Sequence, residues 1–354
     1  MLRKIFIALA VVITSLNAFA AKLENAKVVE HDASRGVGAL IRQLAGSAST
    51  VWMSWDEPVS DPDSCMCCFA STDEGQRHQW RAGRCTLGAK GGNFFNGTND
   101  AGPPVSRTAF AIFARAEEGS VVELRLFSED CVVDAKGVTI HHLGGVTPAE
   151  SIAWLEAYAQ DQVSRSKKDS HQAVSAIAMH RAPQVVDALE RLVKGAHSDD
   201  VRGQAAFWLG ARGGARGRQV LRGVIDDEPS HHLVDQAIAG IAQDEDRAAT
   251  DLLLALARTH RSTQVRKQSI FWLGQRAGEK ATANLKEATN DPDDEVREMA
   301  VFSISQLPRD QAVPELIQLA RTHKSRVVRE KALFWLGQSG DPRALDFIEE
   351  VLTK

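Results

Sequence analysis

A seven-residue pattern of apolar and polar positions recurs through the second half of the chain. Its clearest copies end in Phe-Trp-Leu-Gly and occupy residues 204–210, 268–274 and 331–337. Weaker copies occupy residues 172–178, 236–242 and 299–305. Equivalent positions lie 31 or 32 residues apart. A fixed period in this range indicates a solenoid of stacked repeats.

Each repeat is predicted to contain two helices, of which the first carries the seven-residue pattern. Second helices with an amphipathic pattern are predicted at 183–193, 248–258, 311–321 and 343–352. The helical region begins at Thr147, which can cap a helix that has Pro148 at its first position and Glu150 to complete a capping box. We therefore predict an all-α solenoid over residues 147–354, with about six repeats of 32 residues.

Helical geometry separates the two aromatic residues of the pattern. At about 100° per residue, Trp208 falls on the same face as Ala205 and Leu209, whereas Phe207 lies roughly 145° from the centre of that face. We therefore expect the tryptophans to be core residues, namely Trp208, Trp272 and Trp335. The phenylalanines form an outer column that is the candidate partner-binding surface, namely Phe207, Phe271, Phe302 and Phe334. The alternative is that each phenylalanine packs against the next repeat.

The pattern changes before residue 147. Strand-like runs occur at 51–55, 108–114 and 120–127, and the last two are joined by a hairpin signal, Glu117-Glu118-Gly119. Residues 132–143 predict a further hairpin, bent at 134–137, and residues 34–45 predict one short helix. Together these elements predict an α+β domain over residues 21–146, followed by the solenoid.

Residues 1–20 have the pattern of a secretory signal peptide. Arg3 and Lys4 precede an apolar run, and Ala18-Phe19-Ala20 forms a cleavage site, so cleavage is expected after Ala20. No later run approaches the roughly 18 apolar residues that a membrane-spanning helix needs. We expect an exported protein, periplasmic or extracellular in a bacterium, with no membrane span once the signal peptide is removed.

The five cysteines are confined to the first domain, where an oxidising compartment would favour disulfides. The candidates are Cys65, Cys67, Cys68, Cys85 and Cys131. Two disulfides and one leftover thiol allow fifteen pairings, and the sequence does not choose among them. The alternative is a metal or redox site at Cys65–Cys68, because thiolates and the Met66 thioether suit Cu(I) and Cys65 and Cys68 have C-x-x-C spacing.

Other candidate chemistry is weaker. The formal net charge of −4 gives no argument for nucleic-acid binding. The chain has no G-x-S-x-G, H-E-x-x-H or Walker motif, which favours a non-enzymatic protein. Neighbouring histidines at 141–142 and 231–232 diverge in either secondary structure, so no metal or cofactor is predicted. The glycine-rich segment 213–217 could hold a phosphate, but a turn between helices explains it better.

The repeats resemble a known family. A Val-Arg pair recurs at 201–202, 265–266, 296–297 and 328–329, and Gly-Asp-Pro-Arg-Ala follows at 340–344. These residues resemble bacterial HEAT-like repeats, including the type named after phycobiliprotein lyases, over about residues 165–354. The resemblance implies an α-α superhelix with a concave binding groove. We expect the arginines to bridge adjacent repeats through acidic partners, except where Val234 replaces the arginine.

The sequence thus favours a secreted or periplasmic, non-enzymatic scaffold that binds a protein or peptide partner of the cell envelope through its solenoid. One alternative is a metal- or redox-handling protein that uses the Cys65–Cys68 cluster. Another, implied by the resemblance, is a HEAT-type chromophore lyase or chaperone. The first domain resembles no family that we can place.

Overall fold

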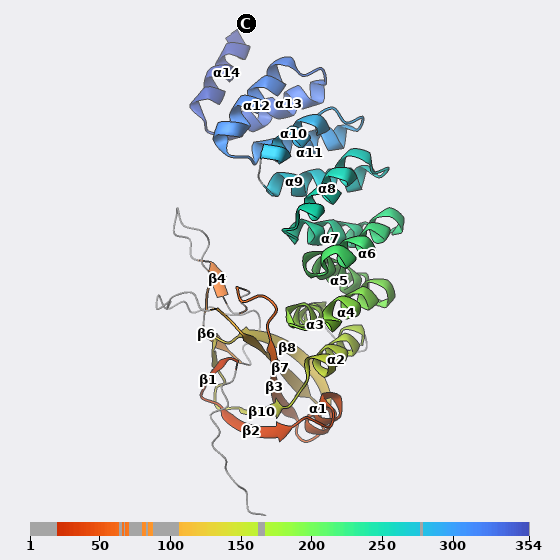
Figure 1. The fold of residues 1–354 in the computed structure, drawn as a ribbon. Helices are drawn as coiled ribbons and strands as arrows, with labels where there is room; N and C mark the ends of the chain where they lie inside the picture. The colour runs from red at the N-terminus through yellow and green to blue at the C-terminus, as the bar shows by residue number, and fades with distance from the viewer. Residues whose placement is uncertain are drawn as a thin grey trace, which may run out of the picture. The chain divides into compact units, whose positions relative to one another are not determined.

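The computed structural model describes residues 20–63, 66, 68–70, 80–82, 84–87, 106–161, 167–276 and 279–353. The chain divides into two compact units, Met1–Val146 and Thr147–Lys354 (Figure 1). Cys65, Cys67 and all of the predicted signal peptide except Ala20 lie outside the described residues. No helix among the described residues is both long enough and apolar enough to cross a membrane.

A mixed five-stranded sheet organises the first unit. In spatial order its strands are β2 (Lys27–Asp32), β10 (Thr139–Gly144), β3 (Thr50–Pro58), β7 (Ala109–Glu117) and β8 (Ser120–Ser128). Strands β2, β10 and β3 run parallel, whereas β3, β7 and β8 are antiparallel neighbours. The predicted β7–β8 hairpin is confirmed. Its two loop residues, Glu118 and Gly119, have φ values of 49° and 84°, as a type I′ turn requires.

The hairpin predicted over residues 132–143 is wrong. Strand β9 (Val132–Asp134) lies in a separate three-stranded sheet, between β1 (Lys22–Glu24) and β6 (Arg84–Thr86), and pairs parallel with both. Strand β10 inserts between β2 and β3 of the larger sheet. Parallel neighbours come from distant parts of a chain, so the local pattern around residues 134–137 does not reveal them.

Apolar side chains are buried on both faces of the large sheet. Helix α1 (Val37–Ala45) packs against β3 and β8. A second cluster includes Trp52, Phe113, Phe127 and Ile140 together with residues of the smaller sheet. Strands β4 (Cys68–Ala70) and β5 (Trp80–Ala82) form an antiparallel pair. The first unit is therefore α+β, as predicted.

The second unit is a stack of helices in chain order (Figure 1). Helix α2 (Pro148–Gln160) begins with the predicted capping box between Thr147 and Glu150. The helices that carry the repeated pattern are α3 (Lys167–Met179), α5 (Asp199–Arg212), α7 (His231–Gln243), α9 (Thr263–Gln275), α11 (Asp294–Ser305) and α13 (Arg326–Gln338). We call these the first helices.

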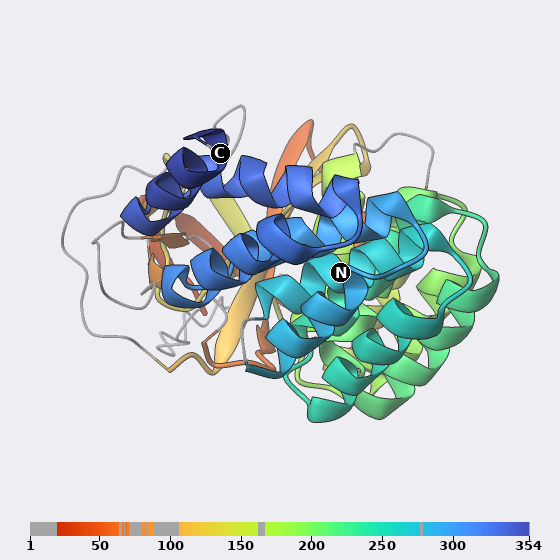
Figure 2. The ribbon, with the colours of Figure 1, turned by 90° about the horizontal axis from the view of Figure 1, so that it is seen from above.

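The second helices alternate with the first. They are α4 (Gln184–Gly195), α6 (Gly214–Asp227), α8 (Arg247–Thr259), α10 (Glu279–Ala288), α12 (Arg309–Thr322) and α14 (Pro342–Thr353). Each first helix contacts the first helices of neighbouring repeats as well as second helices. Figure 2 views the stack from the end that carries the C-terminus and shows the last helices lying side by side.

Candidate interaction surface

The tryptophans of the repeated pattern are not core residues. Trp208, Trp272 and Trp335 are half-buried, which corrects the prediction. In α5 the buried positions are Val201, Gly203, Ala205, Ala206, Leu209 and Gly210. They span a wider arc than the prediction assumed, because a first helix packs against neighbouring first helices as well as against second helices. The tryptophan lies at the edge of this arc.

Two of the tryptophans, Trp208 and Trp335, contact the preceding repeat. The indole Nε1 of Trp208 donates to Ser175 Oγ at 3.2 Å, and the ring of Trp335 lies 5.2 Å from that of Phe302. Ser175 and Phe302 occupy the phenylalanine position of their own repeats. The two aromatic positions of the pattern therefore meet across the boundary between repeats.

Five rings form a continuous aromatic row across α9, α11 and α13. Phe271 packs edge-on against Trp272 at 5.3 Å and stacks on Phe302 at 6.2 Å with an interplanar angle of 4°. Phe302 contacts Trp335, which in turn packs against Phe334 at 5.1 Å. These five residues are the aromatic row. Phe271 and Phe302 pack against the next repeat, as the alternative proposed, whereas Phe334 packs within its own helix. None of the five rings is fully buried.

The fourth candidate, Phe207, stands apart from the aromatic row. It packs against Trp208 within its own helix at 5.3 Å. The next first helix, α7, carries Ala239 and Gly240 at the two aromatic positions, so no ring links Phe207 to Phe271. Of the four phenylalanines predicted to form the outer column, the three on the last three first helices therefore belong to the aromatic row.

A small pocket adjoins the end of the aromatic row. Its volume is about 210 Å³, and Trp335 forms one wall. Ala312, Val313 and Leu316 of α12 add apolar surface. The remaining lining residues are polar: Ser305, Gln306, Arg309, Gln338 and Ser339. The lining is thus mixed, and the volume is below the roughly 300–1,000 Å³ of small-molecule pockets, so it suits a single side chain of a partner. The sequence pattern did not indicate it, because its residues come from three helices.

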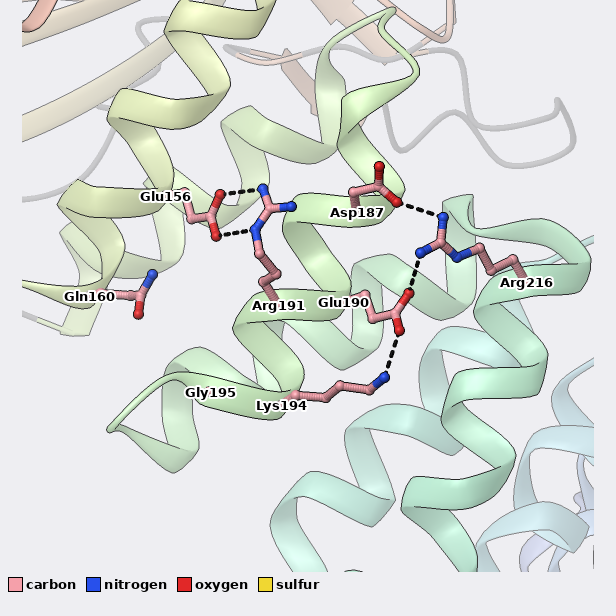
Figure 3. A pocket seen from close by; sticks show the side chains of 8 residues that line it. All are labelled: Glu156, Gln160, Asp187, Glu190, Arg191, Lys194, Gly195 and Arg216. Carbon is pink, nitrogen blue, oxygen red and sulfur yellow. Dashed lines mark hydrogen bonds and ion pairs between the residues drawn. The ribbon is translucent and has the colours of Figure 1, made fainter.

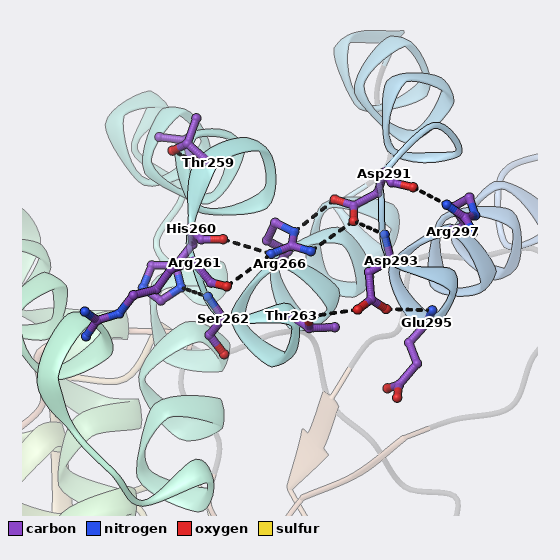
Figure 4. A network of polar contacts seen from close by, with 11 residues as sticks. Thr259, His260, Arg261, Ser262, Thr263, Arg266, Asp291, Asp293, Glu295 and Arg297 are labelled. Carbon is purple, nitrogen blue, oxygen red and sulfur yellow. Dashed lines mark hydrogen bonds and ion pairs between the residues drawn. The ribbon is translucent and has the colours of Figure 1, made fainter.

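The arginines of the Val-Arg pairs bridge adjacent repeats at two positions, which confirms that expectation there. Arg266 donates to both carboxylate oxygens of Asp291 at 2.9 and 3.0 Å, and to the carbonyl oxygen of His260 at 3.0 Å (Figure 4). Arg202 forms an ion pair with Glu228. The side chains of Arg266 and Asp291 are only 11% and 9% exposed. This contact therefore joins turns between helices, which is a structural role.

The hydrogen bond with Asp291 raises the pKa of Arg266. Asp291 also accepts from the amide of Asp293, at 2.9 Å. Asp293 in turn accepts from Thr263 Oγ1 and caps α11 through the amide of Glu295 (Figure 4). The acidic turn thus satisfies backbone donors at a helix start, as expected from its position.

A charged hollow of about 590 Å³ lies along α2, α4 and α6 (Figure 3). Arg191 pairs with Glu156, Arg216 pairs with Asp187 and Glu190, and Lys194 pairs with Glu190. Each charged side chain that lines the hollow therefore already has an ion-pair partner within it. This surface offers little charge to a ligand.

Of the glycine-rich segment 213–217, only the first residue lies in the expected turn, whereas residues 214–217 form the first turn of α6. Gly213 lies between α5 and α6, and Gly214 has a φ of 53°. Arg216 pairs with carboxylates in the charged hollow, and Arg218 pairs with Asp244 and Asp246. Both guanidinium groups are thus neutralised by carboxylates rather than left for a phosphate.

The neighbouring histidines at 141–142 point to opposite faces of β10, as expected. His141 lies against His31 of β2, with 2.8 Å between His141 Nδ1 and His31 Nε2. His142 Nδ1 lies 3.1 Å from Ser54 Oγ. The pairing with His31 follows from the parallel register of β2 and β10, which sequence reasoning missed. Burial, followed by the charge of His31, lowers the pKa of His141.

Among the described residues, no group of three or more His, Cys, Asp or Glu side chains is arranged to hold a metal ion. His231 and His232 are exposed at the start of α7. Of the disulfide candidates, Cys131 carries a free, buried thiol that donates to the carbonyl oxygen of Met66. Burial raises its pKa. Cys131 is therefore not a disulfide partner in this structure.

The disulfide pairing of the other four cysteines stays a prediction. Cys85 is buried in β6. Cys68 belongs to β4, but its side chain is not among those described, and Cys65 and Cys67 lie outside the described residues.

Comparison with known proteins identifies the repeats. A family model described as HEAT repeats matches residues 235–305 and 283–354, and no curated protein matches the chain.

Among solved structures, human deoxyhypusine hydroxylase in complex with glycerol is 18% identical, over 57% of this chain and 77% of its own, with a TM-score of 0.26. The complex of CpcE and CpcF of phycocyanin lyase from Nostoc is 22% identical, over 42% and 98%, with a TM-score of 0.33. The Escherichia coli protein YibA is 20% identical, over 55% and 71%, with a TM-score of 0.36. At these TM-scores the three likenesses carry no argument about function. The family model is the firmer finding: residues 235–354 consist of HEAT repeats.

Proposed function

We propose that the chain is an exported, non-enzymatic scaffold that binds a protein or peptide partner along the aromatic row. The observation that carries this proposal is the continuity of the five rings across α9, α11 and α13. The row ends at Phe334, whose side chain is 55% exposed. Solenoids bind partners through extended surfaces of this kind.

The chemistry of the aromatic row suits an apolar segment of a partner. Aromatic rings provide a large contact area and have few rotatable bonds, so they dominate many protein interfaces. The pocket beside Trp335 can accept one apolar side chain, and Gln306 and Gln338 at its rim can bond to a peptide backbone. In contrast, the charged hollow along α2, α4 and α6 is neutralised by its own ion pairs.

Export of the chain to the cell envelope is part of the same proposal. The signal-peptide pattern supports it, and disulfides among Cys65, Cys67, Cys68 and Cys85 would suit an oxidising compartment. The metal or redox alternative at Cys65–Cys68 falls on side chains that are not described. No described residue favours the chromophore lyase or chaperone alternative, so we do not propose it.

Two apolar side chains of nearly equal exposure allow a matched test. Phe334 of the aromatic row is 55% exposed, and Leu345 of α14 is 54% exposed. The immobilised exported protein is incubated with the envelope fraction of its source cells, and captured proteins are quantified by mass spectrometry. Phe334→Ser should weaken capture of a specific partner about tenfold, the effect of losing ~1.4 kcal/mol of binding free energy. Leu345→Ser should leave capture unchanged.

Stability is measured on the same variants, because both side chains are exposed and neither change should unfold the repeats. A partner that binds equally well to wild type and Phe334→Ser would contradict the proposal. An equal loss with Leu345→Ser would also contradict it, since binding would then depend on general surface hydrophobicity.

A further inference from the structure

The residues next to the predicted cleavage site are buried inside the first unit. Ala20 and Ala21 are 5% and 1% exposed and belong to the core cluster around Trp52 and Ile140. The amide of Lys22 donates to the carbonyl oxygen of Cys131 at 2.9 Å, and strand β1 begins at this residue. The predicted cleavage site is therefore joined directly to the fold, with no spacer.

A half-buried carboxylate, with 24% of its side chain exposed, faces this segment. Asp56 of β3 lies on the same face of the strand as Trp52, because side chains alternate along a strand. Its Oδ2 accepts the amide of Ala20 at 3.0 Å and lies 4.0 Å from His142 Nε2. Its Oδ1 is buried and has no hydrogen-bond partner among the residues that the structure describes. Burial raises the pKa of Asp56, whereas the Ala20 amide and His142 lower it; the negative charges of Glu57 and Glu30 raise it further.

Cleavage after Ala20 would change what Asp56 faces. Hydrolysis of the Ala20–Ala21 bond by a leader peptidase consumes one water. The hydroxyl group goes to the Ala20 carbonyl carbon and the proton to the Ala21 nitrogen, which takes up a second proton and becomes an ammonium group. The amide of Ala20 leaves with the signal peptide. The new positive charge lies on the nitrogen of the next residue, Ala21. Successive Cα atoms are only about 3.8 Å apart, so this charge remains close to Asp56.

We propose that processing supplies the counter-ion of Asp56: the ammonium group of Ala21 pairs with this carboxylate and anchors the new amino terminus in the core. An ammonium group has three donors and a full charge where the amide had one donor, so it can also satisfy the unpartnered Oδ1. Removing a carboxylate from water is unfavourable unless an opposite charge compensates for it. Because the bond is buried in the folded unit, cleavage precedes the folding of β1.

This inference rests on the proposed export and on cleavage after Ala20. Cleavage alone would leave a solvated amino terminus of ordinary reactivity, whereas this inference predicts an α-amine of lowered reactivity. An amine paired with a carboxylate has its pKa raised above the usual ~7.7–8.0, and each unit of increase lowers the fraction of reactive free amine about tenfold.

The test uses the full chain, exported with its own leader from a bacterial host. Terminal sequencing and intact mass identify the first residue. The α-amine is then labelled with a limiting amount of acetylating reagent at pH 7, and its rate of modification is measured by peptide mass spectrometry. In folded wild type this rate should be at least about tenfold lower than in Asp56→Asn. Asp63→Asn, which removes an exposed carboxylate of the same unit, is the control and should behave as wild type.

A second variant keeps the test valid if Asp56→Asn fails to fold. A Gly-Ser extension placed before Ala21 moves the amine away from Asp56 and should restore fast labelling without altering Asp56. If the mature chain begins at another residue, both the predicted cleavage and this inference fail. If it begins at Ala21 but labels equally fast in wild type, in Asp56→Asn and in the extended chain, only the ion pair is overturned.

Discussion

Gly210 of α5 and Gly240 of α7 lie where two neighbouring first helices cross very closely. A Cβ atom at Gly210 would lie 2.4 Å from the carbonyl carbon of Gly240 and 2.5 Å from the amide nitrogen of Ile241. Carbon atoms in favourable contact are about 3.5–4.0 Å apart. Both neighbours are backbone atoms, so no rotamer change relieves the overlap. We predict that Gly210→Ala forces the two helices apart.

Two terms of opposite sign set the size of the effect. Overpacking typically costs about 1–3 kcal/mol, and a clash with backbone should lie near the upper value. Alanine is favoured over glycine within a helix by about 1 kcal/mol. The free energy of unfolding should therefore fall by about 2 kcal/mol, the difference between these terms.

The repeated pattern provides a matched control at Gly337 of α13, the equivalent position of the last copy. A Cβ atom there meets nothing within 4 Å. Without a clash, only the higher helix propensity of alanine over glycine acts, so Gly337→Ala should stabilise the chain by up to about 1 kcal/mol. Urea unfolding followed by far-UV circular dichroism measures both variants. The reasoning is refuted if both midpoints shift in the same direction, or if Gly210→Ala is as stable as wild type.

Two further predictions concern charge. Arg266→Met leaves Asp291 buried without its cation, so the free energy of unfolding should fall by about 3 kcal/mol. Arg326→Met removes an ion pair whose side chains are 82% and 56% exposed and should cost less than about 1 kcal/mol. Equal shifts of the two melting temperatures would contradict this. His141 has a folded pKa below its ordinary 6.5. Its contribution to stability is complete above pH 6.5 and is lost as the pH falls towards the folded pKa. The melting temperature should therefore fall less between pH 7 and pH 5 in a His141→Gln variant than in wild type; an unchanged fall would show that His141 does not contribute.

Local signals in the sequence determined much of the architecture. The 31- or 32-residue period predicted the helix stack, because each repeat must bury its apolar face against its neighbours. The capping box at Thr147 and the turn at Glu118-Gly119 were also predicted, since both depend on residues within a few positions of each other.

The candidate surface was predicted only in part. Phe271, Phe302 and Phe334 do belong to a row of rings, but the tryptophans were assigned to the core and are half-buried instead. An angular argument treats a helix as having one packed side, whereas a first helix of this stack packs against several neighbours. The pocket beside Trp335 was not foreseen, because three helices contribute to it.

The sequence by itself thus determined the order and type of most elements, because caps, turns and periodicity act over short stretches of chain. Tertiary structure alone decided which elements became neighbours. It placed β10 between two parallel strands, brought His31 to His141, and set Asp56 beside Ala20. These contacts join residues 36 and 110 positions apart. Their energies depend on burial and on partners that no local pattern specifies.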